Sequence, residues 1–285
     1  MLRSFLAPAA FFAFLISVLT LGNPAVAAGQ SPTATPPAAP TQSEKTQAID
    51  KNQKSFTAEQ VAESAIFIYG SRPVLNQIRR NGVERGRICK PTCEGPSRTE
   101  DATYERRFVR GDNSEKDKIR LDQKMPTLEY SLIYGEGKLW GIINGAAFTP
   151  RQDAANVFLS QQRHSIDSLL RYKENGSTLT LVGKDKQKGL DLYVLDVVGK
   201  DKLKTRYYLS SKTLRVVWLE YEEPSGGSQP LKFKRSFHDY RYAQQTLVPY
   251  RSVLLEDGKQ TQETRILTVT YGTRLDDSLF KAPEA

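Results

Sequence analysis

The stretch KTRYYLSSKTLRVVWLEYEE, residues 204–223, decides the fold. Two runs rich in Tyr, Val, Leu and Trp, 205–209 and 213–222, flank the polar residues 210–212, which have the length and polarity of a hairpin loop. The segment 224–228 that follows contains Pro and two Gly and ends the pairing. This stretch therefore predicts an antiparallel hairpin.

The same kind of pattern continues toward the C-terminus. Apolar runs at 231–242, 247–256 and 261–271 predict three more strands. Asp257 and Gly258 between the last two indicate a type I′ turn, because both central residues of that turn need positive φ. The last third of the chain therefore reads as a run of antiparallel strands.

Both faces of these strands carry large apolar residues. In a sheet with one wet face, alternate side chains are polar, since successive side chains point to opposite sides. Here strict alternation puts Leu214, Val216 and Trp218 on one face and Val217, Leu219 and Tyr221 on the other. Upstream, Leu190, Leu192 and Val194 alternate with Tyr193, Leu195 and Val197. The apolar side chains on both faces must therefore be shielded from water. Either the sheet curves around an apolar hollow, or it packs between a helix and an ordinary core.

Helix signals flank the front half of the chain. Thr57 is an N-cap with Gln60 three residues on, Phe56 can pack on Val61, and Gly70 ends the helix. A further turn or two is expected at 74–80. Strands are expected at 83–88, 102–110, 118–122, 128–134 and 138–143. A second helix is predicted from Thr149 and Pro150 to about residue 173, placed to lie across the sheet.

The N-terminal residues predict export. A charged start, an apolar run over 5–21 and the small residues 25–27 have the order of a secretory signal peptide, so residues 1–28 are expected to be removed. No Cys follows the cleavage site for lipid attachment. Residues 29–55, rich in Pro, Ala and Thr, predict a disordered linker. Residues 56–285 are then expected to form a single exported domain.

The net charge of +9 comes from 41 basic and 32 acidic residues spread along the chain. Such a surface attracts anionic partners, including membrane headgroups and acidic proteins, or serves only solubility. The chain has no recognisable nucleic-acid motif, and export argues against a nucleic-acid partner.

Two cysteines, Cys89 and Cys93, are the only ones in the chain. In an oxidising compartment two neighbouring thiols are expected to pair. A disulfide that closes so small a loop stabilises the folded state by only about 2 kcal/mol in the chain-entropy model. It would therefore fix a local loop rather than hold the whole fold together. A redox-active cysteine pair usually has two residues between the cysteines, whereas this pair has three. A zinc site needs four ligands, and besides the two cysteines the chain offers only His164 and His238 as typical zinc ligands. A structural disulfide is the favoured interpretation, and no metal or cofactor is expected.

Catalytic constellations are weak. Ser236, His238 and Asp239 are close in sequence, but on a strand Asp239 points away from the other two. Ser278 and Lys281 have a serine-to-lysine spacing that is common by chance. Glu220 and Glu222 have the character of a solvated strand end rather than of a glycosidase pair. The sequence therefore favours a protein without enzymatic activity.

The C-terminal third carries a family resemblance. The helix ending at Gly70, the meander with one central helix, and the motifs FHDYR (237–241), VPYR (248–251), DG (257–258) and LDDSLF (275–280) resemble the LolA-like periplasmic lipoprotein carriers and outer-membrane lipoprotein-sorting proteins. The resemblance implies an α+β fold: an antiparallel, unclosed half β-barrel with helices over its concave face.

The resemblance also implies a hydrophobic cavity that binds lipids or the acyl chains of lipoproteins and carries them between membranes. Eight large residues are hypothesised to include cavity or lid positions: Trp140, Phe148, Phe158, Leu192, Val194, Val216, Trp218 and Phe233. The family has an arginine that contacts the lid, for which Arg107, Arg110 and Arg120 are the options here. The alternative from another class is a non-catalytic sensor or scaffold that binds a protein partner through the same fold. Transient contact with a membrane or membrane protein is compatible with either.

Overall fold

The structure, a computed structural model, describes residues 56–225 and 229–281. The predicted signal peptide (1–28) and linker (29–55) lie outside the described residues. Residues from 56 onward belong to one compact unit.

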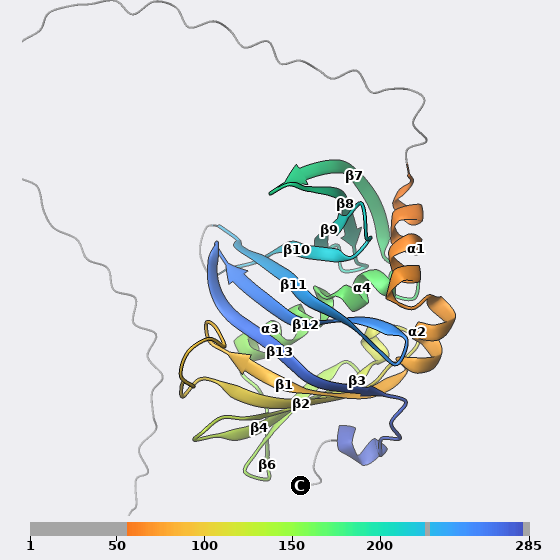
Figure 1. Ribbon diagram of the computed structural model, residues 1–285. Helices are drawn as coiled ribbons and strands as arrows, with labels where there is room; N and C mark the ends of the chain where they lie inside the picture. The colour runs from red at the N-terminus through yellow and green to blue at the C-terminus, as the bar shows by residue number, and fades with distance from the viewer. Residues whose placement is uncertain (1–55, 226–228, 282–285) are drawn as a thin grey trace, which may run out of the picture. The chain divides into compact units, whose positions relative to one another are not determined.

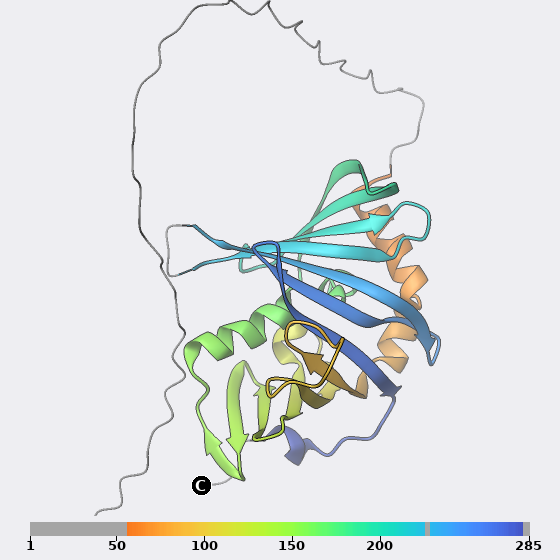
Figure 2. The ribbon, with the colours of Figure 1, turned by 60° about the vertical axis from the view of Figure 1, so that its left-hand side comes forward.

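One large antiparallel sheet organises the described chain. Its strands follow the order β6-β5-β4-β3-β2-β1-β13-β12-β11-β10-β9-β8-β7. In this part of the chain β6 and β7 remain unpaired on their outer sides, so the sheet is not closed. Figures 1 and 2 show it curving so that β7–β10 and β1–β4 lie on either side of α3 and α4. The predicted α+β half-barrel is confirmed.

The strands come mostly in sequence order, joined by hairpins. In the front half they are β1 (Asn81–Cys89), β2 (Ala102–Val109), β3 (Lys118–Lys124), β4 (Glu129–Gly135), β5 (Lys138–Ile143) and β6 (Ala146–Phe148). In the back half they are β7 (Thr178–Gln187), β8 (Leu190–Val198), β9 (Lys204–Ser210), β10 (Val216–Glu223), β11 (Leu231–Ala243), β12 (Thr246–Glu256) and β13 (Lys259–Tyr271). The predicted strands are confirmed with small shifts at their ends, and Asp257 and Gly258 have the positive φ values, 47° and 81°, of the expected turn. Strands β6 and β7 were not predicted.

Helix α1 (Ala58–Tyr69) begins and ends as its sequence predicts. The Thr57 hydroxyl accepts a hydrogen bond from the Gln60 backbone N–H while the Gln60 side chain accepts one from Thr57 N–H, forming a capping box. Gly70 follows with φ of 137°, a conformation that other residues rarely adopt. Helix α2 (Arg72–Ile78) comes directly after it.

The predicted single helix from 149 to 173 is wrong: the segment forms α3 (Gln152–Arg163) and α4 (Ile166–Leu170). The break lies at His164 and Ser165. The His164 ring is buried and stacks on Tyr221 with centroids 3.9 Å apart, and the Tyr207 hydroxyl donates to the Ser165 carbonyl oxygen at 2.7 Å. These sheet contacts replace the hydrogen bonds that would continue the helix.

Strict alternation in β10 is also a wrong prediction. The register between β9 and β10 shifts between Val216 and Trp218, where Val216 faces Leu209 and Trp218 faces Tyr208. Val216 therefore packs with the helices, together with Leu219 and Tyr221, whereas Trp218 turns to the opposite, outer face. In β8 the predicted alternation holds, since Leu195 faces the helices and Leu192 the outer face.

Candidate functional site

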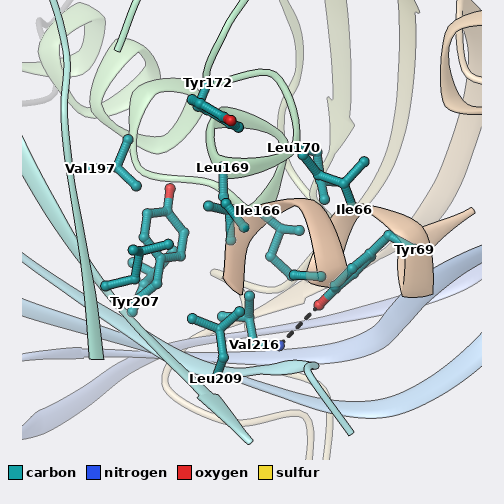
Figure 3. Close-up of a cluster of buried hydrophobic side chains, with 14 of the residues drawn as sticks. Ile66, Tyr69, Ile166, Leu169, Leu170, Tyr172, Val197, Tyr207, Leu209 and Val216 are labelled. Atoms are coloured by element: carbon teal, nitrogen blue, oxygen red, sulfur yellow. Dashed lines mark hydrogen bonds between the residues drawn. The ribbon is translucent and has the colours of Figure 1, made fainter. Parts of the chain in front are cut away.

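The helix-covered face of the sheet has two halves of different character. We call the packed half the cluster in which α1 and α4 lie against β8–β10, with Leu195, Tyr207, Leu209 and Leu219 fully buried. We call the hollow half the region of β1–β4, β12 and β13 under α3, with a second cluster around Phe108, Ile119 and Phe158. Figure 3 shows how side chains from α1, α4 and the strands fill the packed half.

Helix α1 is fixed to the sheet at the bulge of β10. The backbone N–H of Val216 donates to the Tyr69 hydroxyl at 3.2 Å, and the Tyr240 hydroxyl donates to the Val216 carbonyl oxygen at 2.6 Å. The Tyr69 and Tyr240 hydroxyls lie 2.8 Å apart. Burial raises the pKa of Tyr69 to about 12, so its hydroxyl stays neutral. These bonds satisfy backbone groups that the bulge leaves unpaired, which makes α1 a fixed part of the fold.

A cavity of about 430 Å³ lies between α3, α4 and the sheet, mostly in the hollow half. This volume is in the range of small-molecule sites. Its apolar lining comes from the strands and from α3, and it includes Ile88, Phe108, Ile119, Leu121, Leu159, Val248 and Ile266.

Charged residues line the rest of the cavity. Asp167 of α4 accepts hydrogen bonds from Arg79, at 3.0 Å, and from Arg110, which directly follows β2. Burial would raise the pKa of Asp167, but Arg110 and Arg79 outweigh it and hold that pKa well below its ordinary value. Arg171 binds Asp117 at 2.8 and 3.0 Å in the same wall. Asp167 thus joins α4 to the end of α2 and to β2.

Buried polar contacts also hold the start of α4. The His164 Nδ1 and the Thr205 hydroxyl lie 2.6 Å apart, and the His164 Nε2 lies 3.2 Å from the Glu223 carboxylate. Burial, reinforced by the charges of Arg163 and Arg235, lowers the pKa of His164 to about 3. The ring is therefore neutral near pH 7.

Helix α3 is held less firmly than α1 or α4. Of its residues, Phe158 and Ser160 are buried, while Val157 is 58% exposed. Phe158 meets Tyr134 with ring centroids 6.5 Å apart, Gln162 accepts a hydrogen bond from Arg106 at 3.1 Å, and Arg163 pairs with Asp201 at 2.8 Å. Phe158 is the one large apolar side chain that α3 buries, whereas the shorter α4 buries three, so α3 has the smaller apolar contact with the sheet.

The eight residues hypothesised as cavity or lid positions lie on two different faces of the sheet. Phe158, Phe148, Val216 and Phe233 face the helix-covered side, Phe148 lying so close to Gly141 that a Cβ there would come within 2.3 Å of its ring. Leu192, Val194 and Trp218 form a cluster on the outer face. Trp140 pairs with Ile133 across β4 and β5, which puts it on the outer face too. The residues that line the cavity include none of the eight, although Leu159, the neighbour of Phe158 in α3, is a lining residue.

The three candidates for the lid-contacting arginine also lie in different places. Arg107 and Arg120 both bind Asp122 on the outer face of the sheet. Arg110 lines the cavity and contacts a covering helix through Asp167. Arg79, Asp167 and Arg235, which also line the cavity, were missed because their charges carry no periodic signal in the sequence.

The predicted disulfide is present between Cys89 and Cys93. Beside it, the fully buried Glu263 carboxylate accepts hydrogen bonds from Arg251, Arg265 and Thr92. The bridge therefore holds a loop over a buried carboxylate on the outer face, away from the cavity.

The serine and histidine of the weak triad do meet. The His238 Nε2 and the Ser236 hydroxyl lie 3.0 Å apart. The Asp239 carboxylate instead binds Arg241 at 2.6 Å, and none of these residues lines the cavity. The arrangement lacks the carboxylate-to-histidine bond of a hydrolytic triad.

Across 56–225 and 229–281 no helix has the length and apolar character to span a membrane. No family model matches this sequence, and no curated protein matches it.

Solved structures share the fold. A DUF1329 family protein from Desulfovibrio piger superposes with a TM-score of 0.55 at 10% identity, covering 80% of this chain and 98% of that one. A LolA superfamily protein from Nitrosomonas europaea gives 0.55 at 13% identity, covering 80% and 99%. An outer membrane lipoprotein-sorting protein domain from Vibrio parahaemolyticus gives 0.51 at 13% identity, covering 77% and 97%. The resemblance to the LolA-like fold is thus confirmed, at identities that establish the fold alone.

Proposed function

We propose that this protein is an exported, periplasmic carrier that binds acyl chains of lipids or lipoproteins in the cavity of the hollow half. The observation that carries the proposal is the cavity itself, which lies under a weakly seated helix and has an apolar lining from β2, β3 and β13. The LolA-like fold of the neighbours supports it.

The energetics of such a site require a competitor for the ligand. Burying an acyl chain contributes about 0.8 kcal/mol per methylene, so an open apolar site would hold a long chain on the order of 10 kcal/mol too tightly to release it. Helix α3 supplies the competitor, because its Phe158 and Leu159 contact the same apolar surface when the cavity is empty. We propose that α3 moves as the lid, while α1 and α4 stay fixed through Tyr69 and Asp167.

The proposal includes no catalytic step. Asp239 is engaged with Arg241, and the Ser236 and His238 pair lies outside the cavity lining. Binding, transport and release need only differences in apolar burial between cavity, lid and membrane.

A fluorescent fatty-acid probe tests the proposal. The carrier should take up the probe with an increase in emission and pass it on to phospholipid vesicles added afterward. Lipid extracted from protein purified out of the periplasm should identify the natural occupant. A protein that emerges without lipid and takes up no probe would reject the carrier and favour a scaffold that binds a protein partner.

A further inference from the structure

One arginine of the cavity has no anionic partner. Arg235 of β11 lines the cavity, and within the described residues its side chain has neither an ion pair nor a hydrogen bond. Its charge acts on His164, Tyr207 and Tyr221, which puts the guanidinium on the β9–β10 side of the cavity. The other arginines of this wall differ: Arg79 and Arg110 share a carboxylate, and Arg171 has its own.

The guanidinium of Arg235 is half-buried at the cavity wall, so it loses part of its hydration without gaining an ionic partner. Moving a charge from water into a poorly hydrated site costs free energy unless an opposite charge and hydrogen bonds replace the lost water. Burial lowers the pKa of Arg235, with only the hydroxyls of Tyr221 and Tyr207 acting against it. A ligand that supplies an anion at this point would recover the lost solvation.

A second arginine of the cavity is paired only with neutral groups. Arg106 of β2 donates to the Gln162 side-chain oxygen of α3 at 3.1 Å, and its guanidinium carbon lies 4.8 Å from the centre of the Phe108 ring. Neither contact neutralises its charge. The cavity therefore combines an apolar floor at Ile119, Leu121 and Ile266 with two arginines that have no ion pair within the described residues, although Asp167 acts on Arg106 from a distance.

We propose that the ligand is an amphiphile with a carboxylate or phosphate group, which Arg235 binds while the acyl chain lies on the apolar floor of the hollow half. Arg106 adds positive potential from the α3 side of the same cavity. The proposal rests on the carrier function and narrows it from lipids in general to anionic ones. Arginine suits the role because its planar group forms paired hydrogen bonds with carboxylate and phosphate.

The test compares a charged fatty acid with its uncharged methyl ester. Binding of palmitate and of methyl palmitate is measured for the wild type, Arg235→Gln and the control Arg241→Gln, an exposed arginine of the same strand. Loss of one charge-assisted contact should weaken palmitate binding by about tenfold or more in Arg235→Gln, with methyl palmitate changed less than about twofold. Arg241→Gln should bind both ligands as the wild type does.

Phosphatidylcholine vesicles carrying phosphatidate, and inorganic phosphate alone, separate the sources of the anion. Uptake of palmitate, of phosphatidate or of both, each dependent on Arg235, supports the proposal. Inorganic phosphate that binds as tightly as either lipid would overturn it, because the acyl chain would then contribute nothing.

Two further results would contradict the proposal. If Arg235→Gln weakens the binding of palmitate and of its ester equally, or weakens neither, the charge of Arg235 does not recognise the head group. A melting temperature of Arg235→Gln below that of the wild type would assign the arginine a structural role, since removing an unpaired, half-buried charge should leave stability equal or higher. Failure of the wild type to bind either ligand is a different result, which rejects the carrier function itself.

Discussion

The packed half and the hollow half are built from the same sheet but use it differently. In the packed half, α1 and α4 bury Leu195, Leu209 and Leu219 completely, and hydroxyl bonds to the bulge of β10 fix α1. In the hollow half, one lightly seated helix covers a cavity whose wall contains charges. The difference indicates that the first half supplies most of the apolar burial, and on our proposal the second half is the one that opens for a ligand.

Breaking the ion pairs of Asp167, which join the two halves, should have the largest effect on the free energy of unfolding. Replacing Asp167 with Asn leaves the largely buried guanidiniums of Arg79 and Arg110 without a carboxylate. Breaking a buried ion pair from one side costs about 3–5 kcal/mol, and the partly exposed Asp167 should give the lower end of this range. Urea unfolding should show a loss of this size. A matched control is Asp112→Asn, since Asp112 belongs to an exposed ion pair with Lys116 and should cost less than about 1 kcal/mol. Equal losses in the two variants would show that Asp167 does not join the halves.

Truncation of one leucine in each half should separate their packing. Leu219→Ala removes a fully buried side chain from the packed half and should cost about 3 kcal/mol. Leu121→Ala, in the cavity wall, removes a half-buried side chain that already borders empty space and should cost about 1 kcal/mol. Free energies of unfolding from denaturant titrations measure both, and the reverse order would mean that the assigned halves are interchanged.

The acid side of the stability profile should come from the packed half. His164 has a pKa lowered to about 3, below its ordinary value near 6.5, so the unfolded chain binds a proton that the folded chain refuses. Its contribution to stability is complete above pH 6.5 and is lost as the pH falls toward 3. Between pH 7 and 4.5 the loss should be about 2–3 kcal/mol, since pH 4.5 lies two units below the ordinary pKa and each unit corresponds to 1.4 kcal/mol.

Urea midpoints across this range test the assignment to His164. The variant His164→Gln should show a nearly flat profile. The pKa of His238, the other histidine of the chain, is also lowered by burial, so His238→Gln should remove only a small part of the slope. A profile of His164→Gln as steep as that of the wild type would refute the assignment. The carboxyls of Asp167, Glu63 and Glu263, whose pKa values are also lowered, contribute mainly below about pH 4.5.

The smallest expected effect is on the lid itself. Phe158→Leu weakens the seat of α3 against Tyr134 and so favours the open form by about 1 kcal/mol, which corresponds to up to fivefold tighter binding of a fatty-acid probe. Val157→Ala, on the exposed face of α3, should leave the affinity unchanged. Weaker binding in Phe158→Leu would mean that Phe158 contacts the ligand and does not compete with it.

The sequence predicts the sheet well and the site poorly. Hairpin residues, the capping box at Thr57 and apolar runs determine local structure, so the strands and α1 are confirmed within a few residues. The bulge at Val216 and the break at Ser165 depend on Tyr69 and Tyr207, which lie far away in the chain, and local patterns do not contain them. Doubled apolar faces suggested an apolar hollow in the last third, but β9 and β10 belong to the packed half, with Trp218 on the outer face, and the cavity wall in this third comes mainly from β11–β13.

The most direct measurement of the central claim is photo-crosslinking with a fatty acid that carries a diazirine on its chain, followed by peptide mass spectrometry. We predict labels on the cavity wall of β2, β3 and β13 and on α3, with protection by excess unlabelled fatty acid. Labels concentrated on β8–β10 or on the outer face, or labelling that unlabelled fatty acid does not reduce, would contradict the account.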